Sequence, residues 1–305
     1  MNNKIAIIIV TYNGTKWIRE CLNSCQGYDV VVVDNNSTDD TVKIIKEEFS
    51  DVILIEKDEN LGFGKANNLG ISYALNNGFD YVFLLNQDAY IIDKCIEDLI
   101  EVYNKNKNYG ILSPVHLNKA KNQLDRNFAN YVTKNPDFVE DFLLKKTQRE
   151  VYEVPFVNAA AWFLTKEVLM DVGGFDPIFF HYAEDNNYCQ RVIYHNYKIG
   201  VVSNSFVIHD REFREKKHNL STQEKLIIKE RDFKKKYANI NLDLSLEPLL
   251  KKLKRRIIKR SLRLDFNAVN TDLIEYKLVD RIKKIIERSR LKNSSKAPHY
   301  LDVKN

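Results

Sequence analysis

The chain has 305 residues, 44% of them hydrophobic, with 16 Tyr and 16 Phe. It is long enough for one large domain with a substantial core, or for one domain plus an extension, and its low Gly and Pro content argues against a disordered chain. The net charge of +5 is unevenly distributed, because residues 246 to 305 hold 17 Lys and Arg against 7 Asp and Glu, whereas residues 1 to 245 hold 30 against 35. Nucleic-acid binding is disfavoured, since the body is acidic and carries no recognition motif.

The cysteines and the apolar runs bear on the compartment. Cys21, Cys25, Cys95 and Cys189 do not have the spacing of a zinc site, so we interpret them as reduced thiols of a cytosolic chain. The N-terminal apolar run, Ile5 to Val10, is too short for a signal peptide, and no segment reaches the roughly 18 apolar residues of a spanning helix. We therefore expect a cytoplasmic protein, either soluble or peripheral on the inner face of the cell membrane.

Strand and helix signals alternate over the first hundred residues. Continuous β-branched or apolar runs predict buried strands at Ile5–Val10, Val30–Val33, Val52–Ile55 and Tyr81–Leu85. Amphipathic stretches of 10 to 15 residues separate these runs, a pattern typical of βαβ units and a mostly parallel sheet. In such sheets ligands bind beyond the carboxyl ends of the strands. The polar residues after each strand are therefore candidates for a site.

The rest of the chain is less regular. Residues 104 to 150 are rich in Asn and Lys, and we expect a surface excursion there. Val154–Thr165 becomes strand-like towards its end, a helix is expected after Tyr182, and "IGVVSNSFVIHD" predicts a late pair of strands ending on His209. From about residue 245 the pattern changes to long basic amphipathic helices. The predicted domains are residues 1–240, divided at residue 102 into two halves (1–102 and 103–240), and a helical extension at residues 241–305.

Several motifs carry candidate chemistry. Asp34 follows the four valines Val30–Val33 and could bind a base or a ribose, although a turn or helix-capping role is the alternative. Asp88 ends the fourth strand in "NQD", where a hard cation could bridge phosphate oxygens; an Asx turn is the alternative. Glu184 and Asp185 open a helix, and a carboxylate in that position can act as a general base. The glycines of "GFGKANNLG" fit neither the dinucleotide fingerprint nor the P-loop.

Six motifs occur along the chain in this order: "IIIVTYNG", "VVVDNNSTDDT", "ENLGFGKANNLGI", "LLNQDAYI", "GGFDPIFFHYAEDNNYCQRV" and the late "VIHD". Taken together, they resemble the family 2 glycosyltransferases with the GT-A fold. The resemblance covers roughly residues 4 to 215, and the NQD form resembles the rhamnosyltransferase-like branch, which builds bacterial surface polysaccharides. It implies an α/β fold, in which helices flank a mostly parallel, Rossmann-like central sheet. It also implies that residues 1–102 form the nucleotide-sugar-binding half and residues 103–240 the acceptor half.

The resemblance also implies roles for individual residues. Asp185 would be the catalytic base, with Glu184 supporting it, and Asp88 and His209 would lie at a Mg²⁺ or Mn²⁺ ion. Trp162 and the loop containing Phe180, His181 and Tyr182 would shape the acceptor pocket. The donor nucleotide and its diphosphate would be held by Thr11, Tyr12, Asn13, Asp34, Asn36, Asn60, Gly62, Lys65, Asn67, Asn68, Asn86, Gln87 and Asp88. The departure from the family pattern is Asn86, which stands where an acid is usual.

The function implied is an inverting, metal-dependent transfer of a sugar, with rhamnose one candidate, from a dTDP- or UDP-sugar to a hydroxyl of a glycan or lipid-linked saccharide. Two alternatives are a catalytically weak glycan-binding or scaffold subunit of a polysaccharide synthase and a sugar-1-phosphate nucleotidylyltransferase.

In the C-terminal tail, seven of the ten residues Lys251–Arg260 are basic. Its expected apolar faces include Leu250, Leu253 and Ile257, then Leu278, Ile282 and Ile285. These helices would bind an anionic membrane surface, or would pack on the catalytic domain or on a second copy of the chain as a homodimer.

Overall fold

A computed structural model describes residues 4–211 and 220–304. The chain forms two compact units, which we call the sheet unit (residues 1–215 and 296–305) and the helical unit (residues 216–295). The sequence predicted a single boundary at residue 240 between the first domain and the helical extension. In the structure, the helical unit begins earlier and ends before the end of the chain. Helix α9 (Thr222–Tyr237) belongs to the helical unit, and the chain returns to the sheet unit at residue 296.

The sheet unit is built on a nine-stranded mixed sheet in the order β3-β2-β1-β4-β8-β6-β9-β5, with β7 also paired to β9. The half formed by β3, β2, β1 and β4 is entirely parallel, and the antiparallel strand β8 follows it. Continuous apolar runs form these central strands, as expected for strands that are covered on both faces. The strands are β1 (Ile5–Thr11), β2 (Asp29–Asp34), β3 (Ile53–Glu56), β4 (Tyr81–Asn86), β5 (Ala89–Ile92), β6 (Tyr109–Leu117), β7 (Val151–Glu153), β8 (Ala161–Thr165) and β9 (Lys198–His209).

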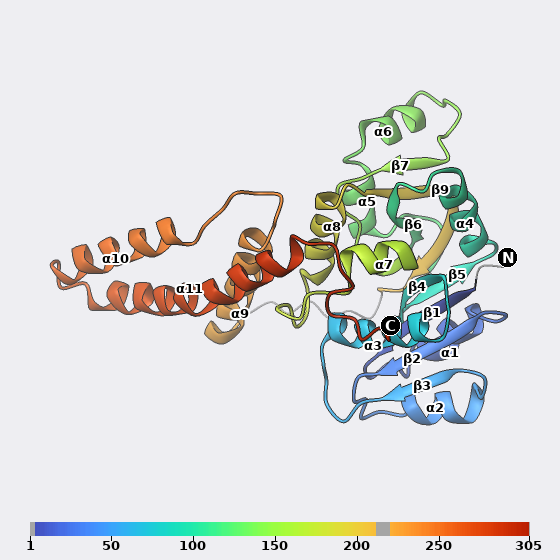
Figure 1. The fold of residues 1–305 in the computed structure, drawn as a ribbon, viewed down its shortest axis with the longest axis horizontal. Helices are drawn as coiled ribbons and strands as arrows, with labels where there is room; N and C mark the ends of the chain where they lie inside the picture. Colours follow the sequence, from blue (N-terminus) through green and yellow to red (C-terminus); the bar gives the residue numbers. More distant parts are fainter. Residues whose placement is uncertain (1–3, 212–219, 305) are drawn as a thin grey trace. The chain divides into compact units, whose positions relative to one another are not determined.

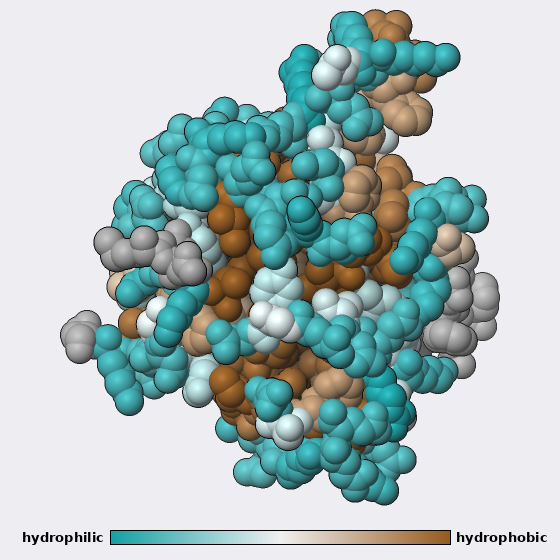
Figure 2. Space-filling model, turned by 90° about the vertical axis from the view of Figure 1, so that its right-hand side faces the viewer, coloured by the Kyte–Doolittle hydropathy of each residue, from teal (hydrophilic) through white to brown (hydrophobic). Residues whose placement is uncertain are grey.

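Helices cover both faces of the sheet (Figure 1). One hydrophobic core joins the sheet to α1 (Ile18–Ser24), α2 (Thr41–Glu48) and α4 (Cys95–Lys105). The core on the other face includes α3 (Phe63–Asn76), α5 (Arg126–Val132), α7 (Lys166–Val172) and α8 (Glu184–Tyr194). The predicted α/β fold, with flanking helices and a C-terminal helical extension, is confirmed. Hydrophilic side chains cover most of the face seen in Figure 2, and hydrophobic ones show between them near its middle.

The expectation of a surface excursion at residues 104 to 150 is wrong for its first part. Residues 109–117 form β6, in which all but the last residue are buried, and this strand pairs with β8 and β9. Gly110, Ser113, Pro114 and His116 interrupt the apolar run and hide the strand in the sequence. The following stretch holds α5 and α6 (Pro136–Leu143), each capped by the preceding Asp or Asn side chain. The late strand pair is instead the single twelve-residue strand β9.

The last residues of the chain complete the sheet unit. Leu301 and Val303 pack against the core on the α3 face. The backbone of this segment also bonds with α3, since Asp302 N–H donates to Ser72 Oγ at 3.0 Å and Lys304 N–H donates to Asn76 Oδ1 at 2.8 Å. We call residues 297–304 the C-terminal strap, because they tie the end of the chain to residues more than two hundred positions earlier.

The helical unit consists of α9, α10 (Glu247–Ser261) and α11 (Phe266–Asn293). Its own core includes Leu250, Leu253, Leu278 and Ile282, so these four residues of the predicted apolar faces are buried. Of the other two, Ile257 is half-buried and Ile285 is exposed. The carboxylate of Asp272, which is 1% exposed, lies 2.6 Å from Arg256 and 2.9 Å from Arg260. Within residues 4–211 and 220–304, no helix is both long and apolar enough to cross a membrane.

Candidate active site

The carboxyl ends of the central strands meet at one edge of the sheet. Thr11, at the end of β1, pairs with Asp34 of β2, and Val10 pairs with Asn86 of β4. Two cavities open at this edge. The first, of about 370 Å³, is lined by Val10, Tyr12, Trp17, Asn35, Asn60, Gly62, Phe63, Asn86, Gln87, Asp88, Phe180 and His181. The second, of about 530 Å³, is lined by Phe63, Asn86, Asn127, Tyr131, Asn158, Ala159, Ala160, His181, Tyr182, Glu184, Asp185 and Arg211.

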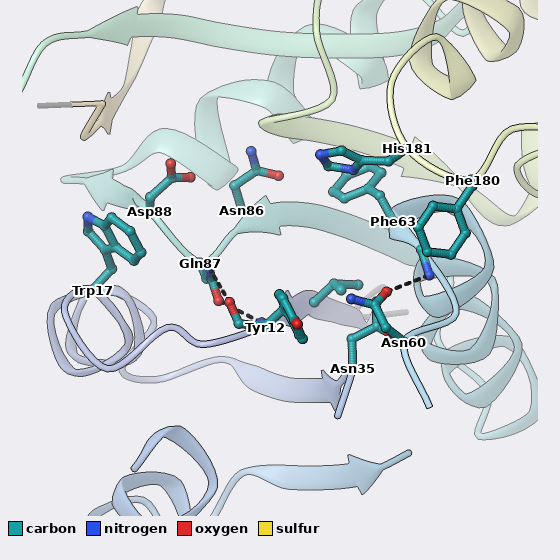
Figure 3. Close-up of a pocket in the computed structure, with 12 residues that line it drawn as sticks. Tyr12, Trp17, Asn35, Asn60, Phe63, Asn86, Gln87, Asp88, Phe180 and His181 are labelled. Atoms are coloured by element: carbon teal, nitrogen blue, oxygen red, sulfur yellow. Dashed lines mark hydrogen bonds between the residues drawn. The ribbon is translucent and has the colours of Figure 1, made fainter. Parts of the chain in front are cut away.

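The two cavities share three side chains, those of Phe63, Asn86 and His181. Asn86 and Asp88 lie on one side of the β4 end, and Gln87 points to the other side, towards Tyr12 (Figure 3). The amide oxygen of Asn86 is buried and has no hydrogen-bond partner among the described residues. Such an atom is costly to leave unpaired. A ligand spanning the two cavities is therefore the natural partner for this oxygen.

Asp88 and His209 come together because β5 pairs with β9. Ala89 lies opposite His209 in this antiparallel pair, and Asp210 N–H donates to the carbonyl of Asp88 at 2.8 Å. His209 Nε2 lies 3.5 Å from Asp88 Oδ1, is buried, and makes no hydrogen bond within the described parts of the chain. On the other side of the ring, Arg211 Nε lies 3.3 Å from His209 Nδ1 and 2.9 Å from Asp125.

These two groups fit a divalent cation that takes its remaining ligands from phosphate and water. A carboxylate and a deprotonated imidazole nitrogen are a suitable donor pair for Mn²⁺, and Mg²⁺ typically binds through one or two carboxylates plus substrate phosphate. Arg211 Nε–H donates to His209 Nδ1, so Nε2 would become a ligand only in the tautomer that carries its proton on Nδ1, with this contact broken. No group of three or more His, Cys, Asp or Glu side chains with metal-binding geometry occurs in the part of the chain that the structure describes. The protein alone would therefore hold such an ion weakly, and a bound diphosphate would complete the site.

Asp185 lies in the wall of the second cavity, in the first turn of α8. Burial raises its pKa above the ordinary Asp value, although hydrogen bonds from Asn186 and from backbone N–H groups oppose this shift. The backbone N–H of Asn186 donates to Asp185 Oδ1 at 2.7 Å, and the side-chain amide donates to the same oxygen at 3.2 Å. A carboxylate with a raised pKa that faces a cavity has the properties of a general base.

The loop before α8 enters the site in an unusual conformation. Tyr182 and Ala183 have φ values of 66° and 71°, in the left-handed region that non-glycine residues seldom occupy. The loop also approaches Gly62 so closely that a Cβ there would lie 2.1 Å from the carbonyl oxygen of Phe180. Gly62 itself has a φ of 78°. The left-handed backbone after His181 and the close approach of the loop to Gly62 together position Phe180 and His181 in the wall of the first cavity.

The structure places six of the predicted nucleotide-sugar residues around the first cavity: Tyr12, Asn60, Gly62, Asn86, Gln87 and Asp88. Asp34 is buried and does not line either cavity, since its oxygens accept hydrogen bonds from Thr11 Oγ1, Ser37 Oγ and Ser37 N–H. Asn13, Asn36 and Lys65 do not line either cavity. Asn36 and Lys65 are exposed, and Asn13 lines a separate surface hollow. Nucleotide binding by these residues stays a prediction.

Four predicted contacts are corrected by burial. Thr11 is fully buried and its hydroxyl donates to Asp34, so it orients that carboxylate. Asn67 Nδ2 donates to the carbonyl of Phe63, and the side-chain amide of Asn68 both donates to the Phe175 carbonyl and accepts from the Phe175 N–H. Trp162, predicted to shape the acceptor pocket, is 0% exposed and packs against Phe175 and Tyr188. Phe180, His181 and Tyr182, predicted with it, do line the cavities.

Several lining residues were not predicted. Asn35 lies one position from the predicted Asn36; its side chain donates to Asn60 Oδ1 at 2.9 Å and accepts from Leu61 N–H at 2.8 Å. Trp17 and Phe63 follow loops that the prediction did use. Asn127 and Tyr131 belong to α5, in the stretch expected to be a surface excursion, and Arg211 lies two residues beyond His209. Asn35 and Phe63 lie within quoted motifs and Arg211 directly follows the "VIHD" motif, whereas Asn127 and Tyr131 had no sequence signal.

The fold agrees with comparisons against known proteins. Residues 6–173, more than half of the chain, match the model of glycosyl transferase family 2. The chain therefore belongs to this family and is a glycosyltransferase.

Among curated proteins, it is 28% identical over 216 residues to the dTDP-rhamnosyl transferase RfbF of Shigella flexneri, with 68% of this chain and 70% of RfbF covered. It is 25% identical over 213 residues to the low-salt glycan biosynthesis hexosyltransferase Agl10 of Haloferax volcanii, with coverage of 69% and 68%. The solved structure of residues 1–349 of S. aureus TarS in complex with UDP-GlcNAc shares the GT-A fold, at a TM-score of 0.56 and 18% identity over 95% of this chain and 88% of TarS 1–349.

Proposed function

We propose that this glycosyltransferase moves a sugar from a nucleotide-sugar in the first cavity to an acceptor hydroxyl in the second, with inversion at the anomeric carbon. The observation that carries the proposal is the shared wall of the two cavities. One cavity contains Asp88, the other contains Asp185, and Asn86 lies in both. This arrangement would put the anomeric carbon of a bound donor between a diphosphate site and a base.

In the proposed reaction, Asp185 removes the proton from the acceptor hydroxyl as the hydroxyl oxygen bonds to the anomeric carbon. The bond between that carbon and the diphosphate oxygen breaks on the opposite face, and the nucleoside diphosphate leaves with the electron pair. A single displacement of this kind inverts the configuration. Asp88 and His209 would hold a divalent cation, which supplies charge neutralisation for the leaving diphosphate.

For the donor, we propose a dTDP- or UDP-sugar, with rhamnose among the candidates. Support comes from the relatives, since RfbF is named for dTDP-rhamnose transfer and TarS was solved with UDP-GlcNAc. Asn86 contributes an uncharged amide where the family usually has an acid. We propose that its unpaired oxygen accepts a hydrogen bond from a hydroxyl of the transferred sugar.

For the acceptor, we propose a glycan or lipid-linked saccharide in polysaccharide synthesis, in keeping with the glycan biosynthesis for which Agl10 is named. Asn127, Tyr131 and Asn158 give the second cavity hydrogen-bonding groups suited to sugar hydroxyls.

The test is to compare the wild-type enzyme with Asp185→Asn, using dTDP-rhamnose and UDP-sugars as donors. We expect donor binding, measured by thermal shift or calorimetry, to be retained and transfer to fall by about 10² to 10⁴-fold. Near-normal turnover by Asp185→Asn would overturn the assignment of the base. Absence of both donor hydrolysis and transfer with every donor that binds would favour the scaffold alternative.

A further inference from the structure

The turn between α10 and α11 exposes an apolar cluster that the helical unit does not use in its core. Ile258, Leu262, Leu264 and Phe266 are 61%, 82%, 72% and 70% exposed. Single exposed apolar residues are ordinary on protein surfaces, but four within nine positions form a patch. We call residues 258–266 the hairpin tip (Figure 1).

Basic side chains surround this patch. Residues 247–266 contain eight Lys and Arg against two acids, Glu247 and Asp265. Asp265 caps α11 by accepting from Ala268 N–H, and Arg256 and Arg260 are paired with Asp272. Within residues 247–266, the other six cations make no ion pair with a carboxylate of the described residues: Lys251, Lys252, Lys254, Arg255, Lys259 and Arg263.

We propose that the hairpin tip docks the protein on an anionic lipid surface, with its apolar side chains in the boundary between headgroups and acyl chains. An amphipathic element of this type needs exposed apolar groups flanked by cations, and each Lys or Arg near an anionic surface adds to the attraction. The sequence suggested that the apolar faces along α10 and α11 would bind the membrane, but these faces are largely buried. Leu250, Leu253, Leu278 and Ile282 are buried within the helical unit.

Charge complementarity favours lipid over a second copy of the chain. A two-fold symmetric contact through the tip would bring Lys259 and Arg263 close to the same residues of the other copy, with Asp265, which caps α11, as the one acid of residues 258–266. Nucleic-acid phosphates would satisfy the cations but would leave the leucines in water. An anionic bilayer satisfies both groups at once.

The test uses the full chain, because removing the C-terminal end would also remove the strap that completes the sheet unit. Binding is measured by co-sedimentation with phosphatidylcholine vesicles and with the same vesicles containing phosphatidylglycerol. The wild-type protein should bind the anionic vesicles far more tightly. The variant Leu262→Ser/Leu264→Ser/Phe266→Ser should bind them about tenfold more weakly, or worse.

A matched control replaces three exposed apolar residues of the same unit that lie outside the tip. Ile227→Ser/Leu242→Ser/Leu291→Ser, at residues 60%, 45% and 78% exposed, should bind as the wild type does. For charge, Lys259→Glu/Arg263→Glu should lower binding by about tenfold or more, and the exposed pair Lys284→Glu/Arg288→Glu, which changes the net charge equally, should lower it much less.

Insertion is read independently from the fluorescence of Leu264→Trp, which should shift to shorter wavelength with anionic vesicles only. Equal binding by the tip and control variants would overturn the proposal, as would equal binding to neutral and anionic vesicles. A dimer that the tip substitutions convert to a monomer would also overturn it and would identify a second copy as the occupant. These measurements do not depend on catalysis, so the proposed transfer reaction and the membrane contact can fail separately.

Discussion

The side-chain amide of Gln87 makes two hydrogen bonds to the backbone of Tyr12. Gln87 Oε1 accepts from Tyr12 N–H at 3.0 Å, and Gln87 Nε2 donates to the Tyr12 carbonyl at 3.2 Å. This contact joins the strand end that carries Asp88 to the loop that forms the opposite wall of the first cavity. A Cβ on Gly14 would lie 2.4 Å from Gln87 Oε1, so the loop has no room for a larger residue there.

Gln87→Ala should therefore weaken donor binding while the protein stays folded. Each hydrogen bond of this kind contributes about 0.5–1.5 kcal/mol, so we expect the KM for the donor to rise by roughly five- to a hundredfold. The effect on kcat should be smaller, because Gln87 holds the wall and touches no reacting atom. A suitable control is Gln123→Ala, an exposed site whose side chain makes no such contact. A wild-type KM in Gln87→Ala would mean that the loop is held by other contacts.

The raised pKa of Asp185 predicts the shape of the pH profile. The base acts when it is deprotonated, and burial shifts its pKa upward, so the rise of kcat/KM with pH should lie above the ordinary Asp range. Measuring kcat/KM against pH at saturating cation checks this expectation. An acid limb at the ordinary Asp pKa would contradict it.

The hydrogen bond from Asn186 to Asp185 gives a second test, because the direction of the resulting pKa shift can be predicted. Its side-chain amide donates to Asp185 Oδ1 and so lowers the pKa of Asp185. Asn186→Ala removes this bond but leaves the backbone bond in place, so the acid limb should move to higher pH. A shift to lower pH would show that the amide does not stabilise the carboxylate.

Removing divalent cations should abolish transfer if Asp88 and His209 hold an ion, and added Mn²⁺ should restore it. Binding of Mn²⁺ in the presence of the nucleoside diphosphate, followed by electron paramagnetic resonance, gives a readout that does not rely on turnover. Asp88→Asn should lose most of this binding, whereas the exposed Asp58→Asn should keep it. Full activity in the presence of a strong chelator would refute the metal proposal.

Asn68 should matter for stability and not for substrate contact. Its amide accepts from Phe175 N–H at 2.7 Å and donates to the Phe175 carbonyl at 2.8 Å, both in the buried interior. Asn68→Ala leaves those two backbone groups without their partners, so we expect a loss of about 2–4 kcal/mol in the free energy of unfolding. Urea denaturation measures this loss, and the exposed Asn104→Ala should change stability by less than about 0.5 kcal/mol. An unchanged free energy together with a raised donor KM would restore Asn68 to the nucleotide site.

The parallel half of the sheet could be predicted because its strands are unbroken apolar runs. Positions at the ends of such strands are also readable, so the sequence could place Asp88, just beyond β4, and His209, at the end of β9, as neighbours at one edge of the sheet. Their binding of a cation stays a prediction. By contrast, β6 contains Gly, Ser, Pro and His among its buried residues, and tertiary pairing with β8 and β9 overrides those local signals.

Within the site, the predictions differ from the structure at residues whose exposure could not be predicted from the sequence. Asn35 and Asn36 are chemically identical, but the chain turns at Asn36 with a φ of 68°, and this leaves Asn35 inside and Asn36 exposed. Likewise, Trp162 looks like a sugar-stacking residue in the sequence, yet its position in the middle of β8 directs it into the core. Neither outcome depends on local sequence alone.

The C-terminal strap also has a consequence for how the protein is made. Ser72 and Asp302, which hydrogen-bond to each other, are 230 residues apart in the chain. On the ribosome, the sheet unit would have its strands in place while α3 still lacked Leu301, Val303 and the backbone groups that cover it. We therefore expect the protein to remain incompletely folded, and more readily cut by proteases, until the entire helical unit and the strap have emerged. Stalled nascent chains that expose residue 295 but not residue 304 would be the intermediates to examine.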